Sequence, residues 1–253
     1  MLHAPVNAET LTIRTIGPVN VTVIDEAGAI AQVREALARG TPDVFGFCNA
    51  HTVNMARKQP AFANALSRMT LFNDGIGLDL ASRLLYSEPF PANLNGTDFT
   101  PRLLAGLQRP TKIFLLGSRP GIAARAGAVF AARYGNVSIA GAHDGFFEET
   151  DSPAIIEHIR GSGSELVLVA MGHPRQEVWS TGHAEKIGVP SLCVGALLDF
   201  TAGEVPRAPA MIRSMRLEWA YRLAMEPRRM AGRYLVGNLS FLAAALRQRF
   251  GWQ

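Results

Sequence analysis

Four short loops of this sequence combine glycines with polar or charged side chains that could do chemistry. The first, 72–77, reads Phe-Asn-Asp-Gly-Ile-Gly. Asp74 could act as a general base here, because a carboxylate in a ligand site can take a proton from a substrate hydroxyl. Asn73 adds a hydrogen-bonding group, and Gly75 and Gly77 would let the backbone approach a ligand closely. The structural alternative is an aspartate that caps a helix or closes a turn.

The second loop, 116–121, reads Leu-Gly-Ser-Arg-Pro-Gly. Pro120 falls near the first position of the helix expected next, where proline is favoured. Gly117 and Ser118 precede it, and the free backbone N–H groups of such a turn could hold a phosphate. A well-capped turn between a strand and a helix would have the same composition, so both interpretations stay open.

The third loop, 170–177, crowds hydrogen-bonding side chains into the start of a helix. Its candidate ligand-binding residues are Gly172, His173, Arg175, Gln176 and Glu177. Arg175 could meet a phosphate, and Gln176 could read the edge of a uracil or a sugar. His173 is a weaker candidate for a catalytic base, because a loop histidine is often simply solvated.

The fourth loop, 195–203, places Asp199 beyond an apolar strand. Asp199 could orient a sugar or pair with an arginine of the C-terminal segment, and neither alternative is preferred. Asn49 follows another expected strand and adds a polar group at the same edge. Open α/β sheets bind ligands at the carboxyl ends of their strands, so the four loops and Asn49 are expected to share one site.

The elements that must position these loops alternate along the chain. The expected strands are 11–16, 21–24, 44–48, 69–72, 112–116, 137–140, 166–170 and 191–194. The expected helices are 27–40, 52–66, 78–85, 97–107, 121–134, 154–159 and 176–187. Continuous apolar strands alternating with helices are typical of a parallel sheet covered on both faces. The fold class is therefore α/β, with a Rossmann-like, mostly parallel sheet.

The segment 206–253 differs from the rest in charge. It holds nine arginines, no lysine and two acids, which gives +7 against +4 for the whole chain. Arginine without lysine suggests forked contacts to phosphate or carboxylate, although a solvated basic helix face is the plain alternative. We therefore expect a Rossmann-like core over 1–205 and a basic helical appendage over 206–253 that binds a diphosphate or a membrane surface.

Composition argues against several other classes of protein. With 48% hydrophobic and 18% charged residues, the 253-residue chain has the composition of a globular protein. Its two cysteines have no disulfide or metal spacing, which favours a reduced, cytoplasmic compartment, and the histidines show no metal spacing. We see no secretory signal, no apolar run long enough to span a bilayer and no nucleic-acid motif, so any membrane contact is expected to be peripheral.

Taken in order, these motifs resemble the WecG/TagA/CpsF bacterial glycosyltransferases, glycosyltransferase family 26. The matching segments are Asn-Ala-His-Thr-Val-Asn at 49–54, Asn-Asp-Gly-Ile-Gly at 73–77, Asn-Gly-Thr-Asp at 95–98, Phe-Leu-Leu-Gly at 114–117, Asp-Gly-Phe-Phe at 144–147, Met-Gly-His-Pro-Arg-Gln-Glu at 171–177, the loop 195–203, Arg-Ala-Pro at 207–209, Leu-Glu-Trp-Ala-Tyr-Arg-Leu at 217–223, Glu-Pro-Arg-Arg at 226–229 and Arg-Tyr at 233–234. Their common order and spacing make the resemblance strong.

The resemblance implies transfer of a hexose or N-acetylhexosamine from a UDP-sugar to a polyprenyl-diphosphate-linked saccharide. This would serve cell-surface or exopolysaccharide synthesis at the inner face of the cell membrane. It implies inversion at the anomeric carbon without a metal ion or other cofactor, with Asp74 as the base. Further substrate-binding residues would be Asn95 and Asp98, and the candidates for a diphosphate clamp are Arg207, Arg216, Arg222, Arg229 and Arg233.

Two departures and two alternatives qualify this interpretation. Phe47 stands where the family often has threonine, and Asn93 where it commonly has arginine, so the identity of the sugar is not carried over. A nicotinamide-dependent oxidoreductase would need a complete Gly-x-Gly-x-x-Gly and an acid about 20 residues later, and we see neither. A non-catalytic module that binds anionic lipid would leave Asp74 and Gln176 without a role. Apolar helix in the tail also permits a homo-oligomer.

Overall fold

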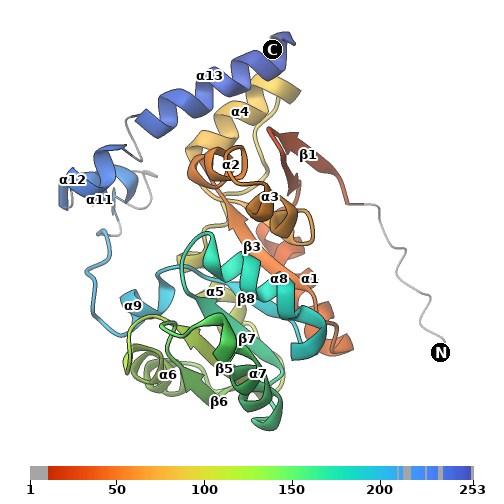
Figure 1. The fold of residues 1–253 in the computed structure, drawn as a ribbon, viewed down its shortest axis with the longest axis vertical. Coiled ribbons are helices and arrows are strands. Elements are labelled where there is room, and N and C mark those ends of the chain that lie inside the picture. Colours follow the sequence, from red (N-terminus) through yellow and green to blue (C-terminus); the bar gives the residue numbers. More distant parts are fainter. Residues whose placement is uncertain (1–10, 210, 213–217, 226, 233–235, 252–253) are drawn as a thin grey trace, which may run out of the picture.

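A six-stranded parallel sheet forms the centre of the protein (Figure 1). The computed structural model describes residues 11–209, 211–212, 218–225, 227–232 and 236–251. The strand order is β4-β3-β8-β7-β5-β6, and β1 and β2 form a separate antiparallel hairpin. The strands are β1 (Ile13–Ile16), β2 (Val19–Thr22), β3 (Val44–Cys48), β4 (Thr70–Asn73), β5 (Thr111–Gly117), β6 (Val137–His143), β7 (Leu166–Ala170) and β8 (Ser191–Cys193). The α/β, Rossmann-like fold predicted from the sequence is confirmed.

Helices follow nearly every strand of the main sheet. Those of the core are α1 (Glu26–Arg39), α2 (Ala50–Ala56), α3 (Pro60–Leu66), α4 (Ile76–Tyr86), α5 (Gly96–Ala105), α6 (Ile122–Arg133), α7 (Ser152–Gly161), α8 (Arg175–Ile187) and α9 (Leu197–Thr201). The C-terminal segment forms α11 (Glu218–Met225), α12 (Pro227–Ala231) and α13 (Gly237–Phe250).

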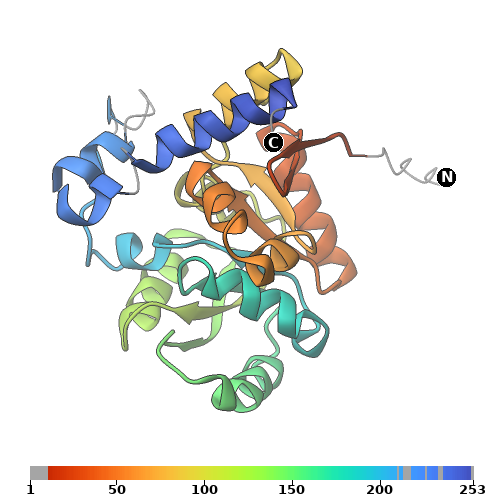
Figure 2. The same ribbon diagram turned by 45° about the horizontal axis from the view of Figure 1, so that its top comes forward.

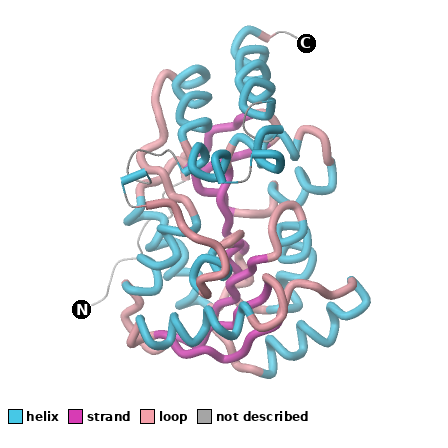
Figure 3. The backbone as a smooth tube through the Cα atoms, turned by 90° about the vertical axis from the view of Figure 1, so that its left-hand side faces the viewer, coloured by secondary structure: helices cyan, strands magenta, loops and turns pink. Residues whose placement is uncertain are grey.

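Side chains of the central strands are buried on both faces of the sheet. In β5, Ile113 and Leu115 join the core beneath α1, α5, α6 and α9, whereas Phe114 and Leu116 join the core beneath α7 and α8. Successive side chains of a strand point to opposite faces, so a continuous apolar run requires two covering layers. Figure 3 shows the strands between helices on either side.

The expected single helix over 52–66 is wrong. The structure has two helices, α2 and α3, and Pro60 is the first residue of the second. Proline has no backbone N–H and its ring clashes with the preceding turn, so it starts a helix readily but interrupts one already formed. The sequence contained this signal, and the apolar periodicity across it was misleading.

The C-terminal helix α13 packs against α2 and α4, where its Phe241 and Ala245 are buried (Figure 2). Gln248 on the same helix accepts a hydrogen bond from the backbone of Gly17 and donates one to Thr15, which ties α13 to the β1–β2 hairpin. The segment predicted as an appendage therefore contributes side chains to the core, and a boundary at 205/206 stays a prediction.

Replacing Phe241 by alanine should destabilise the protein by about 3–5 kcal/mol, because it removes a ring that is 2% exposed and leaves a cavity. Leu239 on the same helix is 72% exposed, and Leu239→Ala should change the free energy of unfolding by less than about 0.5 kcal/mol. Chemical denaturation of both variants tests this. Equal stability of the two would contradict the packing of α13.

Candidate functional site

The predicted site loops meet at one edge of the sheet, because parallel strands all end on the same side. Asn49 follows β3 and caps α2, where its Oδ1 accepts hydrogen bonds from the backbone N–H groups of His51 (3.0 Å) and Thr52 (3.2 Å). Its Nδ2 is then directed at the neighbouring strand end and donates to Oδ2 of Asp74 at 3.2 Å. The cap thus orients the amide that holds the carboxylate.

Asp74 is partly buried, at the junction of β4 and α4. Its backbone N–H donates to Cys48 at 2.8 Å, and the next residue, Gly75, donates its N–H to Oδ1 of Asn93 at 2.5 Å. Gly75 itself is the N-cap of α4, and no side chain caps that helix. The alternative of a helix-capping aspartate is therefore not supported, and the carboxylate is held at the rim of the sheet.

Asn73 lies elsewhere than the sequence suggested. It is 1% exposed, and its Nδ2 donates to Asp79 (3.1 Å) and to the carbonyl of Ala92 (2.9 Å). Adjacent side chains of an extended chain point to opposite sides, so Asp74 faces the rim only if Asn73 faces the packing beneath it. Asn73 supports the site without reaching it.

An open pocket of about 320 Å³ lies where β5, β6, β7 and β8 end. Ser118 and Asp199 line it, and the Ser118 hydroxyl donates to Oδ2 of Asp199 at 3.1 Å. Beside them, Gly117 has φ +140°, and a Cβ there would lie 2.4 Å from the backbone of Ala170. Only glycine lets β5 turn so close to β7, so Gly117 is required for packing, whether or not the loop holds a phosphate as predicted.

Phe146, after β6, is a pocket-lining residue that the sequence did not single out. Its ring is 70% exposed although the backbone around it is fixed. The Phe146 N–H donates to Oδ1 of Asp144 at 2.9 Å, Gly145 donates to Ser118 at 2.9 Å, and the Arg175 guanidinium lies 4.5 Å from the centre of the Phe147 ring. The exposed ring could not be foreseen, because the pair Phe146-Phe147 alone does not reveal which one packs inward.

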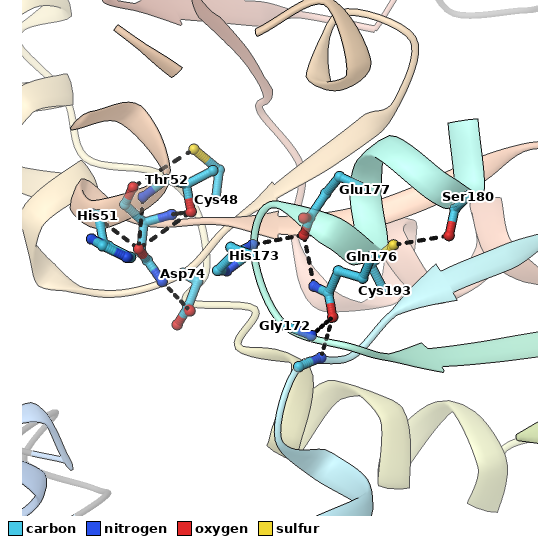
Figure 4. Close-up of polar contacts among 12 residues, drawn as sticks. Cys48, His51, Thr52, Asp74, Gly172, His173, Gln176, Glu177, Ser180 and Cys193 are labelled. Atoms are coloured by element: carbon cyan, nitrogen blue, oxygen red, sulfur yellow. Dashed lines mark hydrogen bonds and ion pairs between the residues drawn. The ribbon is translucent and has the colours of Figure 1, made fainter. Parts of the chain in front are cut away.

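Gln176 is buried, contrary to the expectation that it reads a ligand edge. It is 1% exposed, and its Oε1 accepts from the backbone N–H groups of Gly172 and Gly195, both at 3.2 Å (Figure 4). Its Nε2 donates to Oε1 of Glu177 at 2.6 Å. Gln176 therefore joins the loops after β7 and β8, both of which line the pocket.

Glu177 is also buried, at 1% exposure, and its Oε1 lies 2.7 Å from Nδ1 of His173. Burial by itself would raise the pKa of Glu177, but the charge and hydrogen bond of His173 and the hydrogen bond of Gln176 outweigh it, so the pKa lies below its ordinary value. Of the polar residues in this loop, His173 and Arg175 reach the surface, whereas Gln176 and Glu177 are buried and Glu177 holds His173 from beneath.

The first tail arginine lies at the start of α5. Arg207 donates to Oδ1 of Asp98 at 2.6 Å and to the hydroxyl of Thr97 at 3.0 Å, and Asn95 donates to the other oxygen of Asp98 at 3.0 Å. Arg216 and Arg233 lie outside the described residues, as do the side chains of Arg222 and Arg229. Their predicted role in a clamp stays a prediction.

A parallel sheet whose strand ends carry a pocket and a positioned carboxylate is typical of α/β enzymes. Residues 14–253 match the sequence model of one protein family, the Glycosyl transferase WecG/TagA/CpsF family. The chain belongs to this family. It is therefore a glycosyltransferase of cell-surface polysaccharide synthesis, which implies a sugar-nucleotide donor and a lipid-linked acceptor. Membership favours a transferase over the nicotinamide-dependent alternative.

Two further observations bear on the predicted partners. In the described part of the chain, no three histidine, cysteine, aspartate or glutamate side chains gather as metal ligands would. None of the helices among the same residues combines the length and the hydropathy needed to cross a bilayer.

Replacing Gln176 by leucine should destabilise the protein by at least about 2 kcal/mol, because it leaves two backbone N–H groups without a partner and removes one of the two hydrogen bonds to the buried Glu177 carboxylate. Gln248 also makes two hydrogen bonds to the backbone, but it does so at the surface, where water can replace them. Gln248→Leu should therefore cost less than about 1 kcal/mol. Denaturation midpoints of the two variants provide the comparison. A harmless Gln176→Leu change would show that the two loops do not depend on this bridge.

Proposed function

We propose that the protein is an inverting glycosyltransferase that moves a hexose or N-acetylhexosamine from a UDP-sugar to a polyprenyl-diphosphate-linked saccharide. The observation that carries this proposal is the carboxylate of Asp74, held by Asn49 at the same edge of the sheet as an open pocket. The pocket offers room for a nucleotide, and the carboxylate offers a base for an acceptor hydroxyl.

The chemistry of the pocket suggests how a UDP-sugar would lie in it. The exposed ring of Phe146 offers a face on which a uracil ring can stack, and the pair Ser118–Asp199 offers groups for ribose hydroxyls. The diphosphate would then run past the start of α8, where helical N–H groups favour anions, toward Asp74. This orientation brings the anomeric carbon to the base.

The reaction follows from this arrangement. Asp74 takes the proton of the acceptor hydroxyl, while the oxygen of that hydroxyl bonds to the anomeric carbon from the face opposite UDP. The bond between that carbon and the diphosphate oxygen breaks, and its electron pair leaves with UDP, so the configuration inverts. Negative charge grows on the diphosphate, and we propose that arginines of the tail, rather than a metal ion, stabilise it.

Association with the inner face of the membrane is the remaining part of the proposal. Along α13, Leu239 and Phe250 are 72% and 58% exposed, and Arg247 and Arg249 in the last turn are exposed as well. Exposed apolar side chains next to arginines suit a helix that lies on an anionic bilayer. Such a position would bring the enzyme to an acceptor anchored by its polyprenyl chain.

A direct test incubates the full-length protein with a panel of UDP-sugars and a short-chain polyprenyl-diphosphate glycan. Release of UDP that depends on both substrates is the expected result, and the productive UDP-sugar identifies the donor. Release that does not require the glycan, or no release with any donor in the presence of membrane, would count against the proposed function.

Replacing Asp74 by asparagine should lower kcat by about 10²–10⁴-fold, the usual contribution of a general base. Asparagine keeps the shape and an oxygen for Asn49, so the melting temperature should change little. Asp43 precedes β3, at the opposite edge of the sheet, and Asp43→Asn serves as the matched control with normal turnover. Near-normal turnover of the Asp74 variant would assign the base to another residue.

Replacing Phe146 by alanine should weaken binding of UDP by about tenfold or more, since stacking of a base on an aromatic ring contributes about 1–3 kcal/mol. Phe146→Trp should retain the affinity. Phe250→Ala, which removes another exposed ring far along the chain, controls for general effects. Calorimetric titration with UDP measures the affinity of all three variants. Unchanged affinity of the alanine variant would show that the uracil ring does not stack on Phe146.

A further inference from the structure

His173 couples the surface of the site to a buried charge. Its Nδ1 lies 2.7 Å from Oε1 of Glu177, whose side chain is 2% exposed, whereas the His173 side chain is 20% exposed. Glu177 is therefore out of reach of a ligand, and the imidazole is the part of the pair that reaches the rim. In the view of Figure 4, His173 is drawn between Asp74 and the Gln176–Glu177 pair.

The surroundings favour an ionised Glu177 with a protonated His173. The pKa of Glu177 lies below its ordinary value despite burial, because of His173 and Gln176. A buried carboxylate is stable when it is paired, and among the described residues its second oxygen, Oε2, has no hydrogen-bond partner. The imidazole is thus the neighbour that can supply a balancing positive charge.

The other ionisable groups near this pair do not supply that charge. Burial raises the pKa of the Cys48 thiol in β3 and of the Cys193 thiol in β8, and the negative charge of Glu177 raises both further. Both thiols therefore stay neutral. On the remaining sides, Phe62 of α3 lies 6.2 Å from the His173 ring between centroids, and Asp74 at the end of β4 is an acid.

Resting on the UDP-sugar function proposed above, we propose that His173 is a substrate-contacting residue: held by Glu177 as an imidazolium, it donates a hydrogen bond to the diphosphate of the donor. It precedes α8, at the helix N-terminus where the diphosphate would pass between the nucleotide pocket and Asp74. When the glycosidic carbon–oxygen bond breaks, its electron pair moves onto the diphosphate oxygen and strengthens this hydrogen bond. No proton is transferred to UDP, and His173 remains charged throughout.

The bracing contacts give this role a precise geometry. Glu177 accepts from both His173 and Gln176, and Gln176 holds the loops at Gly172 and Gly195. The imidazolium is therefore positioned relative to both of these walls of the pocket. A lysine or a freely rotating histidine at the surface would carry the same charge without this constraint.

The test compares UDP with uridine, because their difference in affinity isolates the diphosphate. His173→Gln should weaken UDP binding by about tenfold or more, the usual effect of losing a charged hydrogen bond, and leave uridine binding unchanged. In the wild type, the preference for UDP should fall as rising pH removes the imidazolium proton. The variant should lack this fall. Ionisation of UDP itself affects both proteins equally, so the comparison cancels it.

Two further variants keep the test decisive. Glu177→Gln retains a hydrogen-bonding side chain without the counter-charge and should show the same UDP-specific loss, with thermal melting confirming that it folds. His183 also pairs with a glutamate, Glu149, at 2.9 Å, but it lies about two turns past the N-terminus of α8, away from the proposed diphosphate position. His183→Gln should leave the preference for UDP over uridine unchanged.

Four results would overturn the inference. Wild-type affinity of His173→Gln for UDP would remove His173 from the diphosphate site. Equal weakening of UDP binding and uridine binding in His173→Gln would indicate a collapsed loop. If the variant instead lost only the fall of kcat/KM at low pH, His173 would be a general base. If turnover of UDP-sugars is normal in both proteins, this inference fails and the proposed function stands. If the wild type neither binds UDP nor transfers a sugar, the proposed function fails as well.

Discussion

The ionised carboxylate of Glu177 determines how the walls of the pocket are joined. A carboxylate only accepts hydrogen bonds, so the Gln176 amide must turn its Nε2 toward Glu177 and its Oε1 toward the backbone N–H groups of Gly172 and Gly195. The reverse orientation would place the Nε2 donor against the two backbone N–H donors and the Oε1 acceptor against the Glu177 carboxylate. One buried charge thereby orients an amide, and the amide connects two loops that approach from neighbouring strands.

At the other end of the site, where β3 and β4 end, one side chain again makes two contacts. Asn49 uses one atom of its side chain to cap α2 and another to hold Asp74, so formation of the helix and orientation of the acid occur together. Asn93 supports the following turn, because its Oδ1 accepts a hydrogen bond from the backbone N–H of Gly75. The rim therefore combines an acid that accepts a hydrogen bond from the Asn49 amide with a pocket braced by a buried anion.

The C-terminal segment contributes both apolar side chains to the core and arginines to the surface. Phe241 and Ala245 fill the core between α2 and α4, and Arg207 pairs with Asp98 at the start of α5. Deleting the whole segment would uncover this core as well as remove the arginines, so a truncated protein could not separate the two roles. Single substitutions on the exposed and buried faces of α13 do separate them.

Much of the fold could be predicted from the sequence because its signals are local. Runs such as 166–170 are apolar at every position, which is typical of a strand covered on both faces, and the loops that follow parallel strands gather at one edge. The order of the motifs indicated the family, and Asp74 as a rim carboxylate followed from the same local pattern. The break at Pro60 was equally local and was missed only because the apolar period continued across it.

What the tertiary structure decided are the directions of side chains and the contacts between distant segments. Neighbours in the sequence took opposite roles: Asn73 faces the packing while Asp74 faces the rim, and Gln176 is buried while Arg175 is exposed. Gln176 meets Gly195, and Asn54 meets Gly237 of α13 at 2.7 Å, although these partners are far apart along the chain. Local composition sets which backbone forms, but which side chain finds a partner depends on where other elements pack.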